Sequence, residues 1–321
     1  PHCAKECAEK PNDEYQNHAS SRQPQPMNDV VGFSRSNIFN PNLLARTGRQ
    51  SMAIEIMLGI GLAVFFIAFV FAPIGMGGGM LFVPLLHYGA GWAIDGRTIA
   101  VSLMLTAIVS YGSGIAHRRE GFVDDAMVKI GLMGALPGAL FGVLIVSLIG
   151  SHLDVVFKSA SLLMIFWAIR KTIKQMGSSP VQEEEPPTNH EVQTLPLRLG
   201  AAIGGTLSSV LAIGAGVIYV PILRTFAHLS PRVAVGSSLH FMMAVIPISI
   251  CTHLVFLPSQ AMDELIGESA LIACLGAVTF FGARSGALFG IKRLSEQRIM
   301  QMFLLIIIVV ALRYIMDLIG R

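Results

Sequence analysis

Long apolar runs separated by short polar segments occupy the chain from residue 53 to its end, and this pattern predicts an all-α polytopic membrane protein. A helix needs about 20 mostly apolar residues to cross roughly 30 Å of hydrocarbon. Eight runs meet that length, at residues 53–72, 98–116, 130–149, 155–173, 197–214, 233–257, 266–287 and 299–318. We therefore expect about eight transmembrane helices.

Polar segments divide the chain into four parts. Residues 1–50 are rich in Asn, Ser, Gln, Pro and charge, so we expect a disordered tail. In that tail, His2, Cys3, Cys7 and His18 lack a recognisable zinc spacing, and no metal site is predicted. Residues 177–196 contain an acidic triplet followed by a pair of adjacent prolines, which are typical of a solvent linker. The linker separates two expected repeats of four spans each, at 51–176 and 197–321.

A glycine-rich break followed by a proline occurs once in each half. Gly77, Gly78 and Gly79 precede Pro84, and the second half carries Gly214, Gly216 and Pro221 at the corresponding places. The apolar stretch around the first break runs from 53 to 88, too long for one crossing, so we expect a crossing helix, a break and a short helix. The sequence leaves open whether each short helix re-enters or completes a tilted crossing. Four crossings per half would give parallel repeats and five would give inverted ones.

Other landmarks also recur in the same order in the two halves, which indicates an internal duplication. The matched segments are Ala100–Leu103 with Ala234–Ser237, Gly138–Ala139 with Gly282–Ala283, and Ala168–Arg170 with Ala311–Arg313. Chance similarity between apolar sequences is the alternative. Transporters are often built from such repeats, which can move against each other around a shared site.

Composition and charge exclude several classes of function. Hydrophobic residues make up 53% of the chain and charged residues 13%, with a mean hydropathy of +0.63, which is incompatible with a water-soluble fold. The net charge of +3 is scattered, so nucleic acid is not an expected partner. The expected partners are the lipid bilayer and a small anion, with a proton as a possible coupling ion. No cofactor is expected.

Basic residues near the span ends predict the orientation, because they are enriched on the cytoplasmic side. With eight crossings, one side collects Arg46, Arg49, Arg118, Arg119, Lys129, Arg170, Lys171, Lys174, Arg198, Arg313 and Arg321. The other side collects the smaller group Arg97, Lys158, Arg224, Arg232, Lys292, Arg293 and Arg298. From this count we expect both termini in the cytoplasm. The expected location of the protein is the inner membrane.

The glycine breaks are the first candidates for binding. The first amides of a helix have no intrahelical acceptor, and the helix dipole adds about half a positive charge there. A break inside a membrane followed by a helix N-terminus can therefore hold a small anion. The alternative is that these glycines only permit close helix packing.

Four polar side chains are further candidates, each with a structural alternative. Hydroxyls of Ser237 and Ser238, after Gly236, could donate to an oxyanion or could instead bond to the helix backbone. His240 could carry a proton or pack as a buried side chain. The guanidinium of Arg284 could bind an oxyanion with two donors or extend to the lipid headgroups.

The two glycine segments, together with Ser230–Leu239, resemble the sulfite exporter TauE/SafE family over residues 53–320. The resemblance implies an inner-membrane carrier of small sulfur-containing anions such as sulfite or sulfoacetate, with two repeats of four spans. The first half has Val101-Ser102-Leu103 where the family pattern has Gly-Thr-Ser. This departure implies that Gly236, Ser237 and Ser238 of the second half supply most of the polar recognition of the substrate.

The leading functional hypothesis is a secondary carrier, an exporter, that alternates access by moving one repeat against the other. No Walker-type phosphate-binding motif is present, so the chain itself is not expected to use ATP. Two alternatives remain, a passive anion channel and an intramembrane serine hydrolase. The hydrolase would use Ser237 or Ser238 with His240 or His253, although the chain has no Gly-x-Ser-x-Gly elbow.

Overall fold

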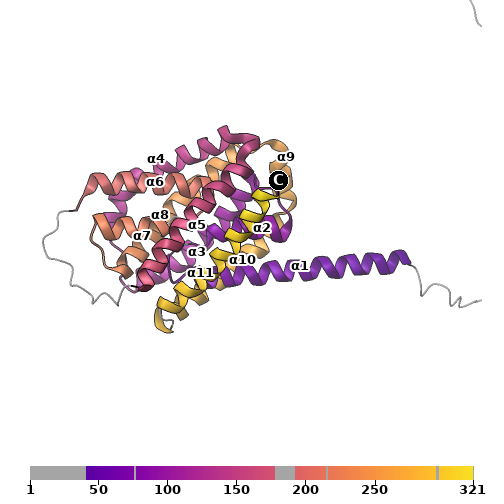
Figure 1. The fold of residues 1–321 in the computed structure, drawn as a ribbon, viewed down its shortest axis with the longest axis horizontal. Helices are drawn as coiled ribbons and strands as arrows, with labels where there is room; N and C mark the ends of the chain where they lie inside the picture. Colours follow the sequence, from indigo (N-terminus) through magenta and orange to yellow (C-terminus); the bar gives the residue numbers. More distant parts are fainter. Residues whose placement is uncertain (1–40, 76, 178–191, 215, 294–295, 321) are drawn as a thin grey trace, which may run out of the picture. The chain divides into compact units, whose positions relative to one another are not determined.

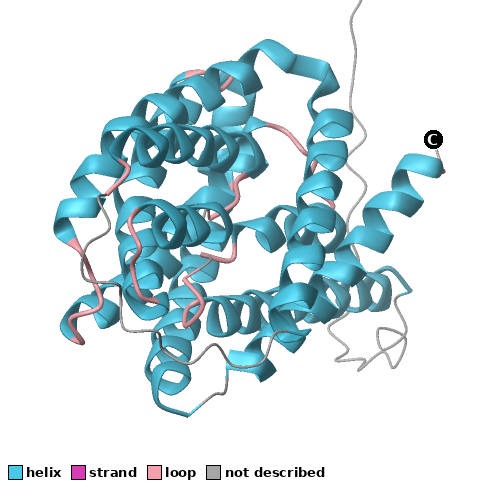
Figure 2. Cartoon of the chain, turned by 60° about the vertical axis from the view of Figure 1, so that its left-hand side comes forward, coloured by secondary structure: helices cyan, strands magenta, loops and turns pink. Residues whose placement is uncertain are grey.

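The computed structural model describes residues 41–75, 77–177, 192–214, 216–293 and 296–320, and these residues form helices joined by short loops (Figure 2). No strand occurs in these ranges. The helices are α1 (Pro41–Phe71), α2 (Gly79–Ala90), α3 (Gly96–Arg119), α4 (Asp125–Ile149), the short 3-10 helix η2 (Gly150–His152), α5 (Leu153–Gly177), α6 (Thr194–Leu211), α7 (Gly216–Phe226), α8 (Pro231–Val255), α9 (Ser259–Gly267), α10 (Ser269–Arg293) and α11 (Glu296–Ile319).

The chain divides into two compact units, Pro1–Gly48 and Arg49–Arg321. In the first unit the structure describes only the beginning of α1, from Pro41, so the helix starts inside the segment expected to be a disordered tail. Proline is favoured at the first position of a helix because its missing N–H has no acceptor there. The rest of the expected tail, with His2, Cys3, Cys7 and His18, lies outside the described residues.

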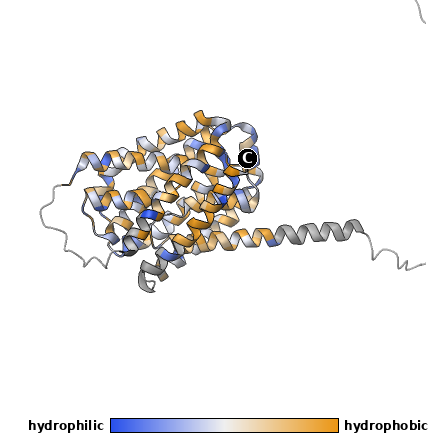
Figure 3. Cartoon of the chain, viewed as in Figure 1, coloured by the Kyte–Doolittle hydropathy of each residue, from blue (hydrophilic) through white to orange (hydrophobic). Residues whose placement is uncertain are grey.

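Four helices of the described residues are long and apolar enough to cross a membrane: α3, α4, α8 and α10 up to Phe289. Three further apolar helices are shorter, namely Glu55–Phe71 of α1, then α2 and α7. Figure 3 shows apolar residues along the length of the bundle and hydrophilic residues mainly toward its two ends. Length and composition thus indicate a multi-pass membrane protein.

The helix directions define two ends of the second unit (Figure 1). At one end, called here the α9 end, lie the α2–α3 connection (residues 91–95), η2 and α9. At the opposite end, called the α7 end, lie the end of α7 and the α3–α4 connection (residues 120–124). The central helices α3 and α8 are antiparallel, since the Tyr111 hydroxyl donates to the Met243 carbonyl at 2.9 Å and Gly96 packs on Leu257.

The two segments that contain the glycine breaks fold back on themselves. Helix α7 runs antiparallel to α6 and returns to the end where α6 began, so that the Gln193 amide donates to the Phe226 carbonyl at 3.1 Å. Helix α2 likewise runs back along α1, with Gly78 on Ile67 and Gly89 on Ile60. Of the two possibilities left open by the sequence, the short helices therefore turn back.

This folding changes the distribution of basic residues. Eight consecutive crossings would put Arg118 and Arg119 on the same side as Arg313. In the structure the first two end α3 at the α7 end, whereas Arg313 lies near the end of α11 at the α9 end. The grouping expected from eight crossings is wrong for these residues. It assumed that the chain crosses once at α1 and once at α6, whereas α2 and α7 bring the chain back to the end from which it came.

Glycines allow the helices that lead into the breaks to make backbone contact with a neighbouring helix, because glycine has no side chain to separate them. A Cβ added at Gly134, Gly138 or Gly142 of α4 would lie 2.0, 2.1 or 2.5 Å from a carbonyl oxygen of α6. A Cβ added at Gly282 or Gly286 of α10 would lie 2.6 or 2.0 Å from a carbonyl oxygen of α1. Both contacts join parallel helices, and both fix the helix that leads into a break. Such small-residue contacts are the usual means of close helix packing in membranes.

Candidate functional site

The two glycine breaks, which are more than a hundred residues apart in the sequence, meet inside the bundle. A Cβ added at Gly79 would lie 1.9 Å from the Ala212 carbonyl oxygen and 2.8 Å from the Gly214 amide nitrogen. A Cβ added at Gly77 would lie 3.2 Å from the Gly214 Cα. The backbones therefore approach as closely as two chains can, and a side chain at either glycine would separate them.

Backbone conformation explains why the first break contains so many glycines. Gly75, Gly77 and Gly78 all have positive φ angles, at 72°, 71° and 74°. Only glycine adopts this region without a steric cost. In the second break the residue in the left-handed region is Ala212, with φ 49°. Because alanine has a Cβ, this conformation is strained there, whereas glycine would adopt it without strain.

Backbone carbonyls released by the breaks are satisfied by side chains of neighbouring helices. Ser113 of α3 donates its hydroxyl hydrogen to the Ala72 carbonyl at the end of α1. A ring nitrogen of His253 in α8 lies 3.1 Å from the Ser209 carbonyl near the end of α6. Broken helices are tolerated in a membrane protein where such partners are available, so these contacts allow both hairpins to exist.

The broken segments also hold hydroxyl groups of their own half. Ser102 of α3 donates to the Gly79 carbonyl at 3.3 Å, and Ser208 of α6 donates to the Ile213 carbonyl at 2.7 Å. Thr106 of α3 lies against the first break, because its side chain would contact a Cβ at either Gly77 or Gly79. All three side chains are fully buried.

Backbone amide groups at the start of α2 and α7 are also present at the breaks. Gly78, which precedes α2, has no side chain with which to cap the helix. The first N–H groups of each helix have no intrahelical acceptor, and each dipole contributes a partial positive charge. Because Gly79 and Gly216 begin these helices and the two breaks touch, two helix N-termini converge on the middle of the bundle.

The structure brings together most of the sequence-predicted glycines with one of the predicted hydroxyls. Gly77, Gly78, Gly79, Gly214 and Gly216 are all buried at the two breaks. The Ser238 hydroxyl donates to the Val235 carbonyl at 2.8 Å and lies 3.4 Å from the Gly75 carbonyl.

The two predicted prolines lie within the short helices. Pro84 is in α2 and Pro221 is in α7. Each occurs one turn after the N-terminus, where it removes a hydrogen bond and leaves one more carbonyl of the first turn without its usual donor.

Gly236, Ser237 and His240 lie on the part of α8 that packs against the α3–α4 connection. A Cβ at Gly236 would lie 1.7 Å from the Phe122 carbonyl oxygen, so this glycine permits the loop to approach. The Ser237 hydroxyl accepts the Asp124 amide at 2.9 Å. His240 holds its Nδ1 2.9 Å from the Gly236 carbonyl. Gly236 and Ser237 therefore have a structural role at the α7 end, and His240 has its contact within α8.

Arg284 is exposed on α10, and its backbone amide packs against Gly112 of α3. It lies within the apolar part of that helix, nearer to its C-terminal end. A long basic side chain in this position can extend to the headgroup region.

Sequence reasoning missed the polar face of α3. Ser102, Thr106, Ser110, Ser113 and His117 recur every three or four residues and are all buried. That spacing puts them on one face of the helix, and the face contacts both the end of α1 and the start of α2. The periodic hydroxyls inside an apolar span were the signal that could have identified them.

A comparison with known protein families identifies the family of this chain. A profile described as sulfite exporter TauE/SafE matches residues 60–314. The chain belongs to that family. The match includes both breaks and extends from α1 into α11. No curated protein and no solved structure matches the chain. As a member of the TauE/SafE family, the protein is a membrane transport protein.

Proposed function

We propose that this TauE/SafE protein is a secondary carrier that exports a small sulfur-containing anion, such as sulfite or an organosulfonate, and binds it where the two breaks meet. The contact of Gly79 with Ala212 and Gly214 carries this proposal, because it brings the N-termini of α2 and α7 to one place. Helix N-termini bind anions through backbone amides without a fixed cation. The carrier class and the sulfur-containing substrate come from the family.

The binding residues of the proposal follow the geometry. Backbone amides at Gly77–Gly79, Gly214 and Gly216 supply most of the donors, and the hydroxyls of Ser102, Thr106 and Ser238 lie beside them. The Ser237 hydroxyl is bonded to the α3–α4 connection and Arg284 is exposed, so neither is part of the proposed site. The two halves therefore contribute almost equally, in contrast to the expectation that the second half supplies most of the polar recognition.

Alternating access is supported by the order and direction of the helices. Each half contains a hairpin with a break, a central helix and two outer helices, with the short η2 added in the first half and α9 in the second, and the second half runs in the opposite direction to the first. Two such units are inverted repeats, and inverted repeats with broken helices at the middle are a known basis of alternating access. Coupling to a proton or to the membrane potential would drive export.

The distribution of basic residues supports an orientation for this carrier. Near the α7 end lie Arg118, Arg119, Lys129, Arg170, Lys171, Lys174, Arg198, Arg224, Arg232, Lys292, Arg293 and Arg298. The α9 end has Arg49, Arg97, Lys158 and Arg313. Because basic residues are retained in the cytoplasm, the α7 end would face the cytoplasm of an inner-membrane protein. The end of α11 would then face the opposite side, which reverses the expectation drawn from eight crossings.

Counterflow of radiolabelled sulfite into proteoliposomes tests the proposed function. We expect saturable uptake that unlabelled sulfite and sulfonates suppress and that carboxylates and cations do not. A preference for a carboxylate or a cation would contradict the substrate class. Single-channel currents in place of saturable counterflow would show a channel, since a carrier and a channel differ in rate and saturation.

A further inference from the structure

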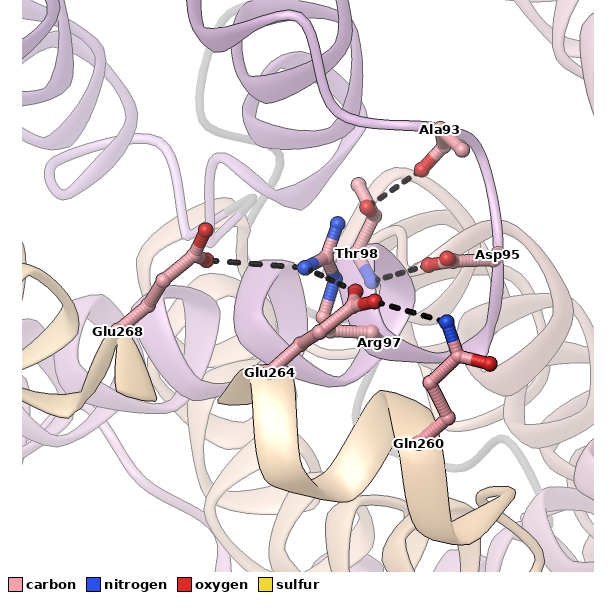
Figure 4. Close-up of polar contacts among 7 residues, drawn as sticks. All are labelled: Ala93, Asp95, Arg97, Thr98, Gln260, Glu264 and Glu268. Carbon is pink, nitrogen blue, oxygen red and sulfur yellow. Dashed lines mark hydrogen bonds and ion pairs between the residues drawn. The ribbon is translucent and has the colours of Figure 1, made fainter. Parts of the chain in front are cut away.

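A buried arginine joins the two halves of the protein at the α9 end. Arg97 is the second residue of α3, and only 8% of its surface is exposed. Its guanidinium Nη1 lies 2.8 Å from Oε2 of Glu264 in α9 and 3.9 Å from Oε2 of Glu268, the residue that follows α9 (Figure 4). Its guanidinium also lies 4.9 Å from the centre of the Trp92 ring of its own half. The arginine thus connects the start of α3 with carboxylates of the second half.

The local structure fixes Arg97 more firmly than its partners. Asp95 caps α3 by accepting the Thr98 amide at 2.9 Å, and the Thr98 hydroxyl donates to the Ala93 carbonyl at 2.6 Å (Figure 4). The Glu264 side chain, in contrast, is 47% exposed, and its second neighbour is the exposed Gln260 at 3.4 Å. Because its partner is exposed to solvent, the ion pair can separate without leaving that carboxylate buried.

The polar groups of this cluster are not fully paired. Arg97 Nε and Glu268 Oε2 are buried and have no hydrogen-bond partner. An unpaired buried polar group costs free energy, and most native structures avoid it. A buried ion pair is in general weak evidence of stabilisation and is better suited to selecting one conformation. Incomplete pairing beside an exposed carboxylate is what a contact that forms and breaks would show.

Ion pairs between the halves occur at the α9 end among the described residues. The second one joins Lys158 of α5, which is fully buried, to Asp317 of α11, and Asp154 lies 2.8 Å from the same amine. At the α7 end the described ion pair is Arg118 with Asp125, which is exposed and stays within the first half. Arg232, which occupies the second position of α8 as Arg97 does in α3, is exposed and lies over the Phe122 ring at 5.7 Å. The two ends therefore differ in how the halves are joined.

We propose that Arg97, Glu264 and Glu268 form a reversible gate at the α9 end, closed in this structure and opened when the central site faces that end. The proposal rests on the carrier function proposed above. Ser102 lies five residues beyond Arg97 on α3, about 7.5 Å farther into the bundle, and its hydroxyl contacts the first break. The gate therefore lies between the α9 end and the proposed binding site.

Accessibility of a cysteine below the gate tests the proposal. The reporter is Ser102→Cys in the full chain with its four native cysteines replaced by serine. A membrane-impermeant methanethiosulfonate is added to the face of sealed vesicles that carries the α9 end. We expect Arg97→Gln and Glu264→Gln each to raise the labelling rate about tenfold, the change given by about 1.4 kcal/mol. The matched control Arg118→Gln removes an exposed ion pair from the same helix and should leave the rate unchanged.

The double variant distinguishes a gate from two unrelated disturbances. Because both single substitutions remove the same interaction, Arg97→Gln with Glu264→Gln should label no faster than Arg97→Gln alone. Additive increases, or single-variant rates equal to that of Arg118→Gln, would overturn the gate. Labelling requires no substrate, so a parent protein that fails to carry sulfite would refute the proposed function and leave this result interpretable.

Discussion

Individual residues at the breaks are constrained by backbone contacts that allow no side chain. Gly79 begins α2 and touches Ala212 and Gly214 of the other half. The sequence marked this glycine as special through its repetition, but a repeated glycine is equally compatible with a turn, a flexible joint or close helix packing. Only the structure shows that its missing Cβ is what brings two distant segments together.

Gly79→Ala is expected to abolish sulfite counterflow and lower the melting temperature in detergent. The added Cβ would meet the Ala212 carbonyl oxygen at 1.9 Å and the Thr106 hydroxyl at 2.7 Å. Since backbone cannot move as a flexible side chain does, we expect a cost of at least about 1–3 kcal/mol. Gly59→Ala is the matched control, because nothing lies within 4 Å of that position. Equal melting and equal counterflow in the two variants would contradict this account of Gly79.

Whole helices were largely predictable from the sequence, and their directions were not. Each of the eight expected spans coincides with a helix, and four of these helices are long and apolar enough to cross. The glycine and proline residues also predicted where α1 and α6 end. Whether α2 and α7 continue forward or turn back depends on contacts such as Gln193 with Phe226, which join residues far apart in sequence.

Cysteine labelling tests the reversal of α7. Gln193→Cys before α6 and Ser230→Cys after α7 are both exposed positions, and a turned-back hairpin puts them on the same face of the membrane. We expect an impermeant maleimide to label both from one face. Ser259→Cys, at the start of α9, should be labelled from the other face and serves as the control. Labelling of the first two positions from opposite faces would favour eight consecutive crossings.

At the scale of the second unit, Arg49–Arg321, the direction of each helix decides at which end of the bundle its basic residues lie. The sequence could list the basic residues but had to assume a number of crossings before assigning them to sides. Turning α2 and α7 back moves Arg118 and Arg119 to the end that also carries Arg224 and Arg232. The same topology joins Arg97 to Glu264, although they are separated by most of the described chain.

Sidedness in intact cells checks the orientation. With the α7 end in the cytoplasm, Ser259→Cys should react with an impermeant maleimide added to intact cells. Ser230→Cys should react only in inverted membrane vesicles, where the cytoplasmic face is outside. The opposite result would place the basic end outside the cell and refute the orientation proposed from charge.

The sequence by itself determined the class of protein, the approximate positions of the helices, the two breaks and the family resemblance, which the profile match confirms. These properties depend on composition and on local spacing, which a single chain displays directly. The tertiary structure decided that the breaks meet, that Ser102 and Thr106 contact the first of them, that the Ser237 hydroxyl bonds to the α3–α4 connection, and that Arg97 joins the halves. These outcomes depend on helix direction and on contacts between residues distant in the chain, and local pattern carries no information about either.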